Sequence, residues 1–204
     1  MATIYSNDGS NTTGLTLVTI NGTVASSGGK IVSTNNASFG LDQCGFLLTT
    51  PIVGAAGMVF SGFWNFPAFG DNFLGIVDAG AFNYADCLGW YNNSLASRVR
   101  PWEKAGFMSG GTNSEFLPVD TDLPWSITIN GDGSCSLMFN GVNNGNSNVG
   151  TSGNYIGKSL QIFQSIWNAS QITRVASLLV DDGVPAPGGN GSILKKFLKM
   201  GMLK

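Results

Sequence analysis

The chain has 204 residues and a mass of 21.3 kDa, enough for one large domain with a sizeable core. Only 11% of its residues are charged, against about 25% in an average soluble domain, whereas glycine (29 residues), asparagine (20) and serine (21) are abundant. Histidine is absent, which excludes a His-based catalytic triad, a His-ligated zinc site and imidazole acid–base catalysis. This composition indicates a β-rich protein with a neutral polar surface.

The first predicted strand is Leu15–Ile20, which the turn pair Asn21-Gly22 closes. A second turn at Ser26–Gly29 precedes a short strand at Lys30–Val32. Residues 1–13 carry no such pattern, and we interpret them as an N-terminal arm. The domain proper is therefore expected to begin at residue 14.

The most aromatic segment of the chain is Met58–Phe66. Its residues Phe60, Trp64 and Phe66 share one parity, so they line one face of a strand, and Pro67 ends it. Two shorter strands are predicted next, at Asn72–Val77 and Cys87–Tyr91.

The clearest local signal is a hairpin over residues 125–140. Trp125, Ile127 and Ile129 alternate with polar residues before the turn, and Cys135, Leu137 and Phe139 do so after it. The link Asn130-Gly131-Asp132-Gly133 supplies the glycines that a tight turn with positive φ angles needs. The hairpin should therefore cover a core with one apolar face.

The last third of the chain is predicted to hold two strands and an arm. A loop at Asn140–Asn154 precedes strands at Tyr155–Phe163 and Gln171–Val180. Residues 183–191 are rich in Pro and Gly and are typical of a linker. Residues 192–204 predict a basic amphipathic helix. Its expected partner-docking residues are Leu194, Lys195, Phe197, Leu198 and Lys199.

Charge is unevenly distributed between the body and this arm. The arm has four lysines and no acid, and the other 191 residues have six basic and twelve acidic groups. An acidic body does not attract phosphate, so we expect no binding of nucleic acid.

Cys44, Cys87 and Cys135 are an odd number without short spacings, which indicates buried reduced thiols rather than disulfides or a zinc site. The N-terminus does not have the pattern of a signal peptide, and no apolar run reaches membrane-spanning length.

The order of these motifs resembles the concanavalin A-like jelly-roll domains, in particular the laminin-G-like group, over roughly residues 28–182. The matching stretches are Phe60–Pro67, Asn72–Val77, Trp125–Asn130, Leu137–Gly141 and Tyr155–Gly157. The final strand departs from the family, because Ile172-Thr173-Arg174-Val175 stands where an acidic pair is usual. The resemblance implies an all-β fold, a two-sheet antiparallel β-sandwich over residues 14–182, with frequent glycan binding, often with calcium.

Two kinds of site follow as expectations. Aromatic rings bordered by amides suit a glycan, and the candidates in or beside loops are Trp90, Tyr91, Asn92 and Trp102. For Trp90 and Trp102 the alternative is a buried position in the core. Calcium needs six to eight oxygen ligands. The best acidic candidates in loops are Asp71, Asp181 and Asp182, although no EF-hand spacing occurs, and the alternative is that these acids are solvated turn residues. No other cofactor is expected.

An enzyme is the less favoured alternative. Related glucanases of this fold carry E-x-D-x-x-E on one strand, and this motif is absent. Asp120-Thr121-Asp122 places two carboxylates on one side of an extended segment, and the competing interpretation is a polar turn before Pro124. We therefore expect no catalytic residues.

The composition is also similar to that of bacteriophage virion proteins. The leading hypothesis is a non-enzymatic virion protein, made and assembled in the host cytoplasm, that decorates the capsid, contacts other virion proteins through its C-terminal arm and forms a homo-oligomer. A tail fibre or tip protein, or a free carbohydrate-binding module for host-surface glycan, is the alternative. The arm itself could instead be disordered or lie on a membrane.

Overall fold

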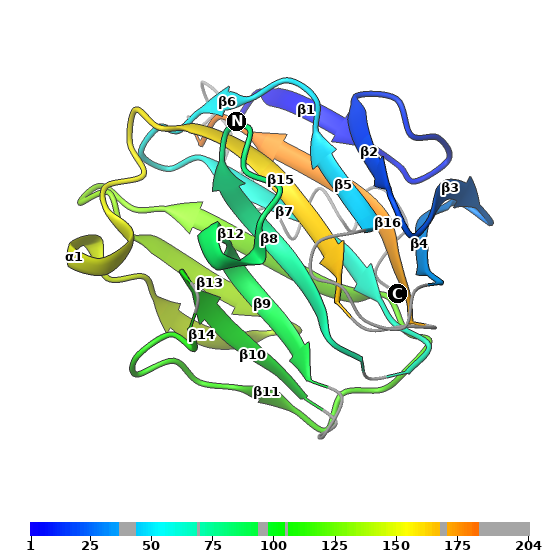
Figure 1. Ribbon diagram of the computed structural model, residues 1–204. Helices are drawn as coiled ribbons and strands as arrows, with labels where there is room; N and C mark the ends of the chain where they lie inside the picture. Colours follow the sequence, from blue (N-terminus) through cyan, green and yellow to red (C-terminus); the bar gives the residue numbers. More distant parts are fainter. Residues whose placement is uncertain (37–43, 69, 94–97, 105, 168–170, 184–204) are drawn as a thin grey trace.

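The fold is a sandwich of two antiparallel β-sheets (Figure 1). The computed structural model describes residues 1–36, 44–68, 70–93, 98–104, 106–167 and 171–183. Within these ranges the only helices are the 3₁₀ turn η1 (Tyr84–Asp86) and the single-turn α1 (Val149–Ser152). The prediction of an all-β sandwich is confirmed.

Sheet A has eight strands. Seven form its main path, in the order β14 (Val142–Asn146), β13 (Cys135–Phe139), β12 (Leu123–Ile129), β7 (Val59–Asn65), β16 (Ile172–Asp181), β4 (Lys30–Asn35) and β3 (Gly22–Ser27). The eighth strand, β1 (Thr3–Asn7), pairs with the last residues of β16. Neighbouring strands in space are thus often distant in sequence.

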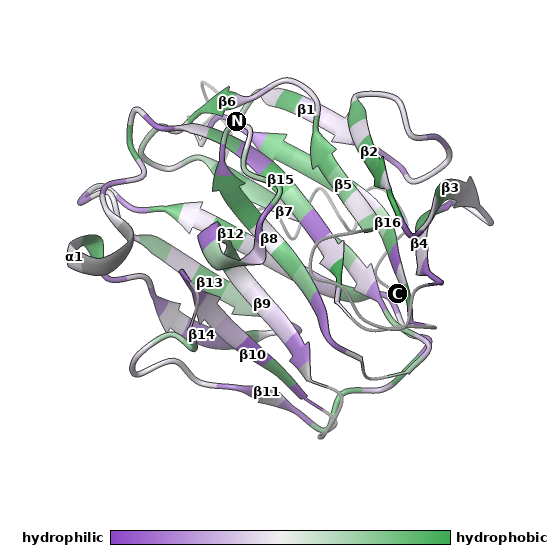
Figure 2. Cartoon of the chain, viewed as in Figure 1, coloured by the Kyte–Doolittle hydropathy of each residue, from purple (hydrophilic) through white to green (hydrophobic). Residues whose placement is uncertain are grey.

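Sheet B has the same size. Its main path is β11 (Ser114–Glu115), β10 (Arg98–Glu103), β9 (Leu88–Asn93), β8 (Asn72–Asp78), β15 (Ser159–Ile166), β5 (Cys44–Leu48) and β2 (Leu15–Thr19). The short β6 (Ile52–Val53) pairs with β15 beside β5. Hydrophobic residues concentrate along β5 and β8, whose residues are buried on both faces almost throughout (Figure 2).

The β12–β13 hairpin forms as predicted. Trp125 lies opposite Phe139 and Ile129 opposite Cys135, and all four side chains are buried. In the turn, Gly133 has a φ of 82°, a left-handed conformation that glycine adopts without strain, and the Asp132 carboxylate accepts from the Ser134 amide at 2.9 Å.

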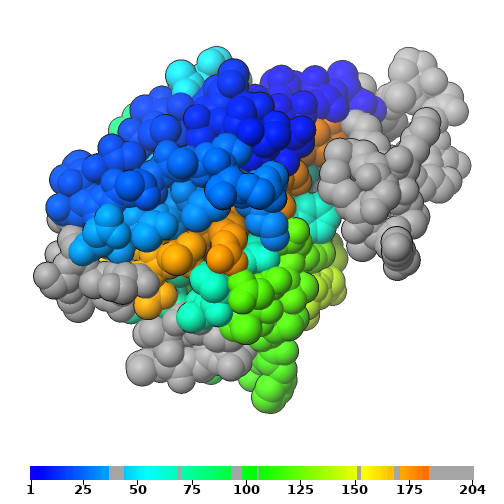
Figure 3. Space-filling view, turned by 90° about the vertical axis from the view of Figure 1, so that its right-hand side faces the viewer, coloured from blue at the N-terminus to red at the C-terminus, as the bar shows by residue number. Residues whose placement is uncertain are grey.

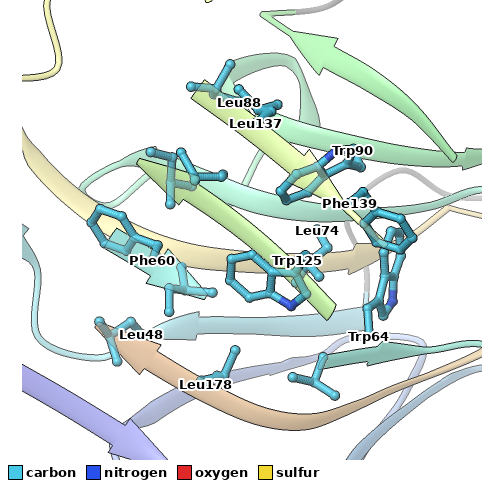
Figure 4. Packing of buried hydrophobic residues seen from close by; sticks show 14 of the residues in the cluster. Leu48, Phe60, Trp64, Leu74, Leu88, Trp90, Trp125, Leu137, Phe139 and Leu178 are labelled. Carbon is cyan, nitrogen blue, oxygen red and sulfur yellow. The ribbon is translucent and has the colours of Figure 1, made fainter. Parts of the chain in front are cut away.

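The core between the sheets is built on the aromatic strand β7. Phe60, Trp64 and Phe66 all belong to the main hydrophobic cluster, which confirms the prediction that they share a face. The Trp64 ring packs edge-on against Phe66, with ring centroids 5.5 Å apart. It also packs edge-on against Phe139 of the hairpin, with centroids 6.0 Å apart (Figure 4). Edge-to-face packing of this kind adds about 0.5–1.5 kcal/mol per pair to the burial of the rings.

The N-terminal segment differs from its prediction as an arm. Thr3–Asn7 pairs with β16 in sheet A, and the Asp181 carboxylate accepts from the Thr3 hydroxyl at 3.0 Å. In the space-filling view the first strands lie directly against the end of the described chain (Figure 3). Residues 3–7 have only a weak hydrophobic pattern, so the sequence does not indicate a strand there. Backbone pairing with β16 stabilises the strand instead.

Other boundaries also differ from the sequence pattern. The predicted loop at 140–154 contains β14 and α1, and the short strands β3, β5, β6, β10 and β11 were not predicted. These strands are short or lack clean alternation, and their partners in the sheets stabilise them. In the described part of the chain no helix is long and apolar enough to cross a membrane. Residues 184–204 lie outside the described residues. They include all of the predicted linker except Gly183, and the whole predicted arm.

Candidate functional site

The four predicted glycan-binding residues lie on opposite faces of sheet B. Side chains alternate along a strand, so on β9 Trp90 and Asn92 point between the sheets, whereas Tyr91 points outward. Trp102 on β10 also points outward and packs against Tyr91, with ring centroids 5.8 Å apart. The structure therefore brings Tyr91 and Trp102 together on the outer face of sheet B.

The prediction that Trp90 and Asn92 contact a glycan is wrong. Trp90 is fully buried, its indole N–H donates to the Asn144 side-chain oxygen at 2.8 Å, and its ring packs on Trp125 (Figure 4). Asn92 is equally buried, beside Asn72 on β8. Neither side chain has an exposed surface that a sugar could contact.

The outer face of sheet B carries a continuous group of aromatic rings, which we call the aromatic face. Its members are Phe73, Tyr84, Tyr91, Trp102, Phe107 and Trp167. Phe73 lies at its centre, with its ring centroid 4.9 Å from that of Tyr91, 5.0 Å from Tyr84 and 5.2 Å from Trp102. Tyr84 stacks on Trp167 at 5.3 Å with an angle of 25° between the rings.

Each ring is placed by a different element. Strand alternation on β8, β9 and β10 directs Phe73, Tyr91 and Trp102 outward. Tyr84 comes from η1, in the β8–β9 connection that returns over sheet B (Figure 1), and the Tyr84 carbonyl accepts from the Trp102 indole at 3.0 Å. Phe107 lies four residues after the end of β10 and forms an isolated antiparallel bridge with Trp102, and Trp167 directly follows β15.

The aromatic face has a buried layer and an accessible layer. Phe73 (1% exposed) and Trp102 (8%) form the floor, whereas Tyr84, Tyr91 and Trp167 are partly exposed and Phe107 is 46% exposed. The floor alone is a small second core beneath the β8–β9 connection. The rings of the accessible layer leave apolar area in contact with solvent.

Polar groups border these rings. The Tyr91 hydroxyl donates to the Asp71 carboxylate, and burial, followed by this bond and the negative charge of Asp71, raises the pKa of Tyr91. The Arg100 guanidinium carbon lies 3.2 Å from the centre of the Phe107 ring, a cation–π contact. Arg98, two residues before it on the same side of β10, forms an ion pair with Glu115 at 3.6 Å. Apolar rings with few convergent polar groups are the usual composition of a ligand site.

Most members of the aromatic face cannot be recognised from the sequence alone. Phe73 lay in a predicted strand, but nothing in the sequence assigned its outward side as functional. Tyr84, Phe107 and Trp167 belong to connections whose path depends on the sheet beneath them. The one local signal was the aromatic content of residues 82–91, and it could not show that β8, β9 and β10 are adjacent.

Three other acids, Asp120, Asp122 and Glu103, form contacts within the fold. Asp120 accepts from the Arg174 guanidinium at 2.6 Å, and Asp122 accepts from the Asn65 amide at 2.8 Å and forms an ion pair with Lys30. Glu103 points inward, where its carboxylate accepts from the backbone amide of Asn148 at 2.9 Å and burial raises its pKa.

The predicted metal ligands are not brought together. Asp71 lies just before β8, near the end of β7, whereas Asp181 pairs in register with Val59 at the start of β7. Asp182 accepts from the Ala2 backbone amide at 2.8 Å. Among the described residues, no three Asp, Glu or Cys side chains form a group that could hold a metal ion. The five predicted docking residues of the arm lie outside the described part.

The sequence matches no protein-family model and no curated protein. Similar folds occur among solved structures. The carbohydrate recognition domain of Emp46p in its potassium-bound form matches with a TM-score of 0.62 and 13% identity, over 88% of this chain and 100% of that one. A Bacillus subtilis protein of unknown function with a galectin-like fold gives a TM-score of 0.56 and 11% identity, over 88% and 96% of the two chains.

A third similar structure comes from work on endo-acting O-glycanases of the human gut microbiota, with a TM-score of 0.61 and 8% identity over 88% of this chain and 98% of that one. All three identities are low, so these likenesses establish the architecture. The chain has a lectin-like β-sandwich fold. Function has to be argued from the residues that this fold positions, because one fold serves many functions.

Proposed function

We propose that this protein is a non-enzymatic carbohydrate-binding domain and that the aromatic face is its binding site. The observation that carries the proposal is the set of partly exposed rings, Tyr84, Tyr91, Phe107 and Trp167, gathered on one sheet face. A pyranose ring has an apolar C–H face that packs on such rings, and its equatorial hydroxyls reach polar groups at their edge. Lectin-like folds among the similar structures support this choice.

Phe107 offers the sharpest test, because it is the most exposed ring of the face at 46%. We expect Phe107→Ala to weaken glycan binding about tenfold, since burying part of an aromatic side chain is worth roughly 1–2 kcal/mol. The measurement is titration calorimetry with a ligand identified on a glycan array.

Met138→Ala is the matched control. Met138 is exposed to a similar extent, 45%, but lies on β13 and points outward from sheet A. The proposal predicts an unchanged affinity for this variant. Equal losses in both variants, or no glycan bound by the unmodified protein on a broad array, would contradict the proposal.

The setting that we propose for this domain is the surface of a bacteriophage particle, as a decoration protein. The support is compositional: few charges, many Gly, Asn and Ser, and a lysine-rich C-terminal segment of 13 residues after a Pro/Gly-rich stretch. Deletion of residues 188–204 should abolish incorporation into particles while the sandwich stays folded. Particles that retain the shortened protein would contradict this setting and leave glycan binding by the domain unaffected.

A further inference from the structure

Arg100 differs from most other cations of the described chain in having no carboxylate partner. Among the described residues, ion pairs join Lys30 to Asp122, Arg98 to Glu115, Lys158 to Asp78 and Arg174 to Asp120. Arg100 forms none of these, and neither does Lys104 in the turn after β10. Arg100 differs from Lys104 in its environment, because it is partly buried on the aromatic face and is held over the Phe107 ring.

The contact with Phe107 leaves the hydrogen-bonding edge of Arg100 unused. A guanidinium is flat, and its five N–H groups lie in its plane. A cation–π contact with an aromatic ring therefore does not use these N–H donors. The Nε atom of Arg100 is buried and has no hydrogen-bond acceptor in the described part of the chain. An unpaired donor of a charged group costs free energy when it is buried, so an acceptor that reaches the accessible part of this guanidinium is favoured.

The other charges around Arg100 are already engaged. Asp71 accepts from the Tyr91 hydroxyl, and Glu115 faces Arg98. Burial and the nearby charge of Arg98 lower the pKa of Arg100, although a guanidinium remains protonated at neutral pH. An acidic group that reaches Arg100 would therefore meet two guanidinium groups on one side of β10.

We propose that the aromatic face binds an anionic sugar, with the Arg100 guanidinium donating two parallel hydrogen bonds to its carboxylate or sulfate group while the rings pack on the pyranose. This inference rests on the proposed carbohydrate-binding function and names the class of its ligand. The fork of the guanidinium matches the two oxygens of such a group. Because the body of the protein has twice as many acids as bases, the attraction has to be local rather than long-range.

Matched pairs of glycans test this inference on the full-length protein. The pairs are oligogalacturonate and its methyl ester, sialyllactose and its methyl ester, and chondroitin sulfate and its desulfated, methyl-esterified form. In each pair the sugar backbone is retained and only the charge changes. We expect at least one acidic member to bind ten times more tightly than its neutral partner, and this ratio to fall with added salt.

Variants then assign the effect to Arg100. Arg100→Gln should reduce affinity for the acidic member roughly 10- to 100-fold, the range for a hydrogen bond to a charged group, and Arg100→Lys should restore part of it because the charge returns without the fork. Lys30→Gln on sheet A removes the same charge and should keep the full acidic preference. Thermal unfolding checks that each variant is folded.

The outcomes separate the two proposals. Binding of neutral members with no acidic preference overturns the anionic-sugar inference and leaves carbohydrate binding standing. An acidic preference that Arg100→Gln and Lys30→Gln reduce equally overturns the role of Arg100. Failure of every glycan to bind overturns the proposed function itself.

Discussion

At the scale of single residues, burial decides the chemistry of the cysteines. Cys44 and Cys135 are fully buried in the main core, and Cys44 donates to the Thr34 carbonyl at 3.3 Å. Burial disfavours a thiolate, which raises the pKa of Cys44 to about 11 and that of Cys135 to about 12, from an ordinary 9.0. All three cysteines are free and buried, in agreement with the interpretation of the sequence.

These raised pKa values predict a loss of stability in alkali. Between pH 9 and about 11 the unfolded chain releases thiol protons that the folded protein retains, so the free energy of unfolding falls as pH rises, by up to about 1.4 kcal/mol per pH unit and thiol. Below pH 9 both states keep these protons and the contribution is constant. Urea unfolding at pH 8, 9.5 and 10.5 measures this slope.

The double variant Cys44→Ala, Cys135→Ala is the control for this slope. It should show a shallower decline than the unmodified protein over the same pH range. Tyr5 and Tyr91, whose pKa values are also raised by burial, remain in both proteins and contribute to the residual slope. An identical slope in the two proteins would show that the thiols are not responsible.

At the scale of elements, two glycines allow β8 and β9 to approach closely beneath the aromatic face. Gly75 and Gly89 are direct partners across the two strands. A Cβ atom on Gly75 would lie 2.1 Å from the Leu88 carbonyl oxygen, and one on Gly89 would lie 2.2 Å from that of Leu74. Because these obstacles are backbone atoms, the strands would have to move apart.

We expect Gly89→Ala to destabilise the protein by about 2 kcal/mol or more, through strain in the central part of sheet B. Gly131→Ala is the matched control, because a Cβ there meets no atom within 4 Å, and its effect should stay within about 0.5 kcal/mol. Chemical denaturation of the two variants compares them directly. Similar stabilities would mean that sheet B tolerates the extra atom by a backbone shift.

At the scale of the whole molecule, the sandwich is complete before the C-terminal segment begins. The last strand, β16, ends at Asp181, and its core residues Val175, Leu178 and Val180 all precede residue 183. The first strand, β1, is already paired with β16. Every described strand of both sheets is therefore retained in a chain that ends at Pro187.

We expect the chain ending at Pro187 to be a folded monomer with an unchanged unfolding midpoint, and the full-length protein to form a defined oligomer. Size-exclusion chromatography with light scattering measures both states. A monomer in both cases would contradict assembly through residues 188–204. A shortened chain that fails to fold would instead show that these residues contribute to the sandwich.

Much of the architecture could be predicted from local pattern. Alternation in the β12–β13 hairpin and the shared parity of Phe60 and Trp64 determine which faces are apolar, since side chains alternate along any strand. The same patterns left β1 and β10 unassigned, because these strands depend on backbone partners that are distant in sequence.

The candidate site depends on contacts between residues that are distant in sequence. The sequence by itself determined an all-β chain without histidine chemistry, with an aromatic core strand and buried thiols, because composition and period-two alternation are local properties. Only the tertiary structure decided that Trp90 is core while Tyr91 is on the surface, and that Phe73, Tyr84, Phe107 and Trp167 meet on one face. The physical reason is that strand order and the paths of connections arise from the packing of two complete sheets.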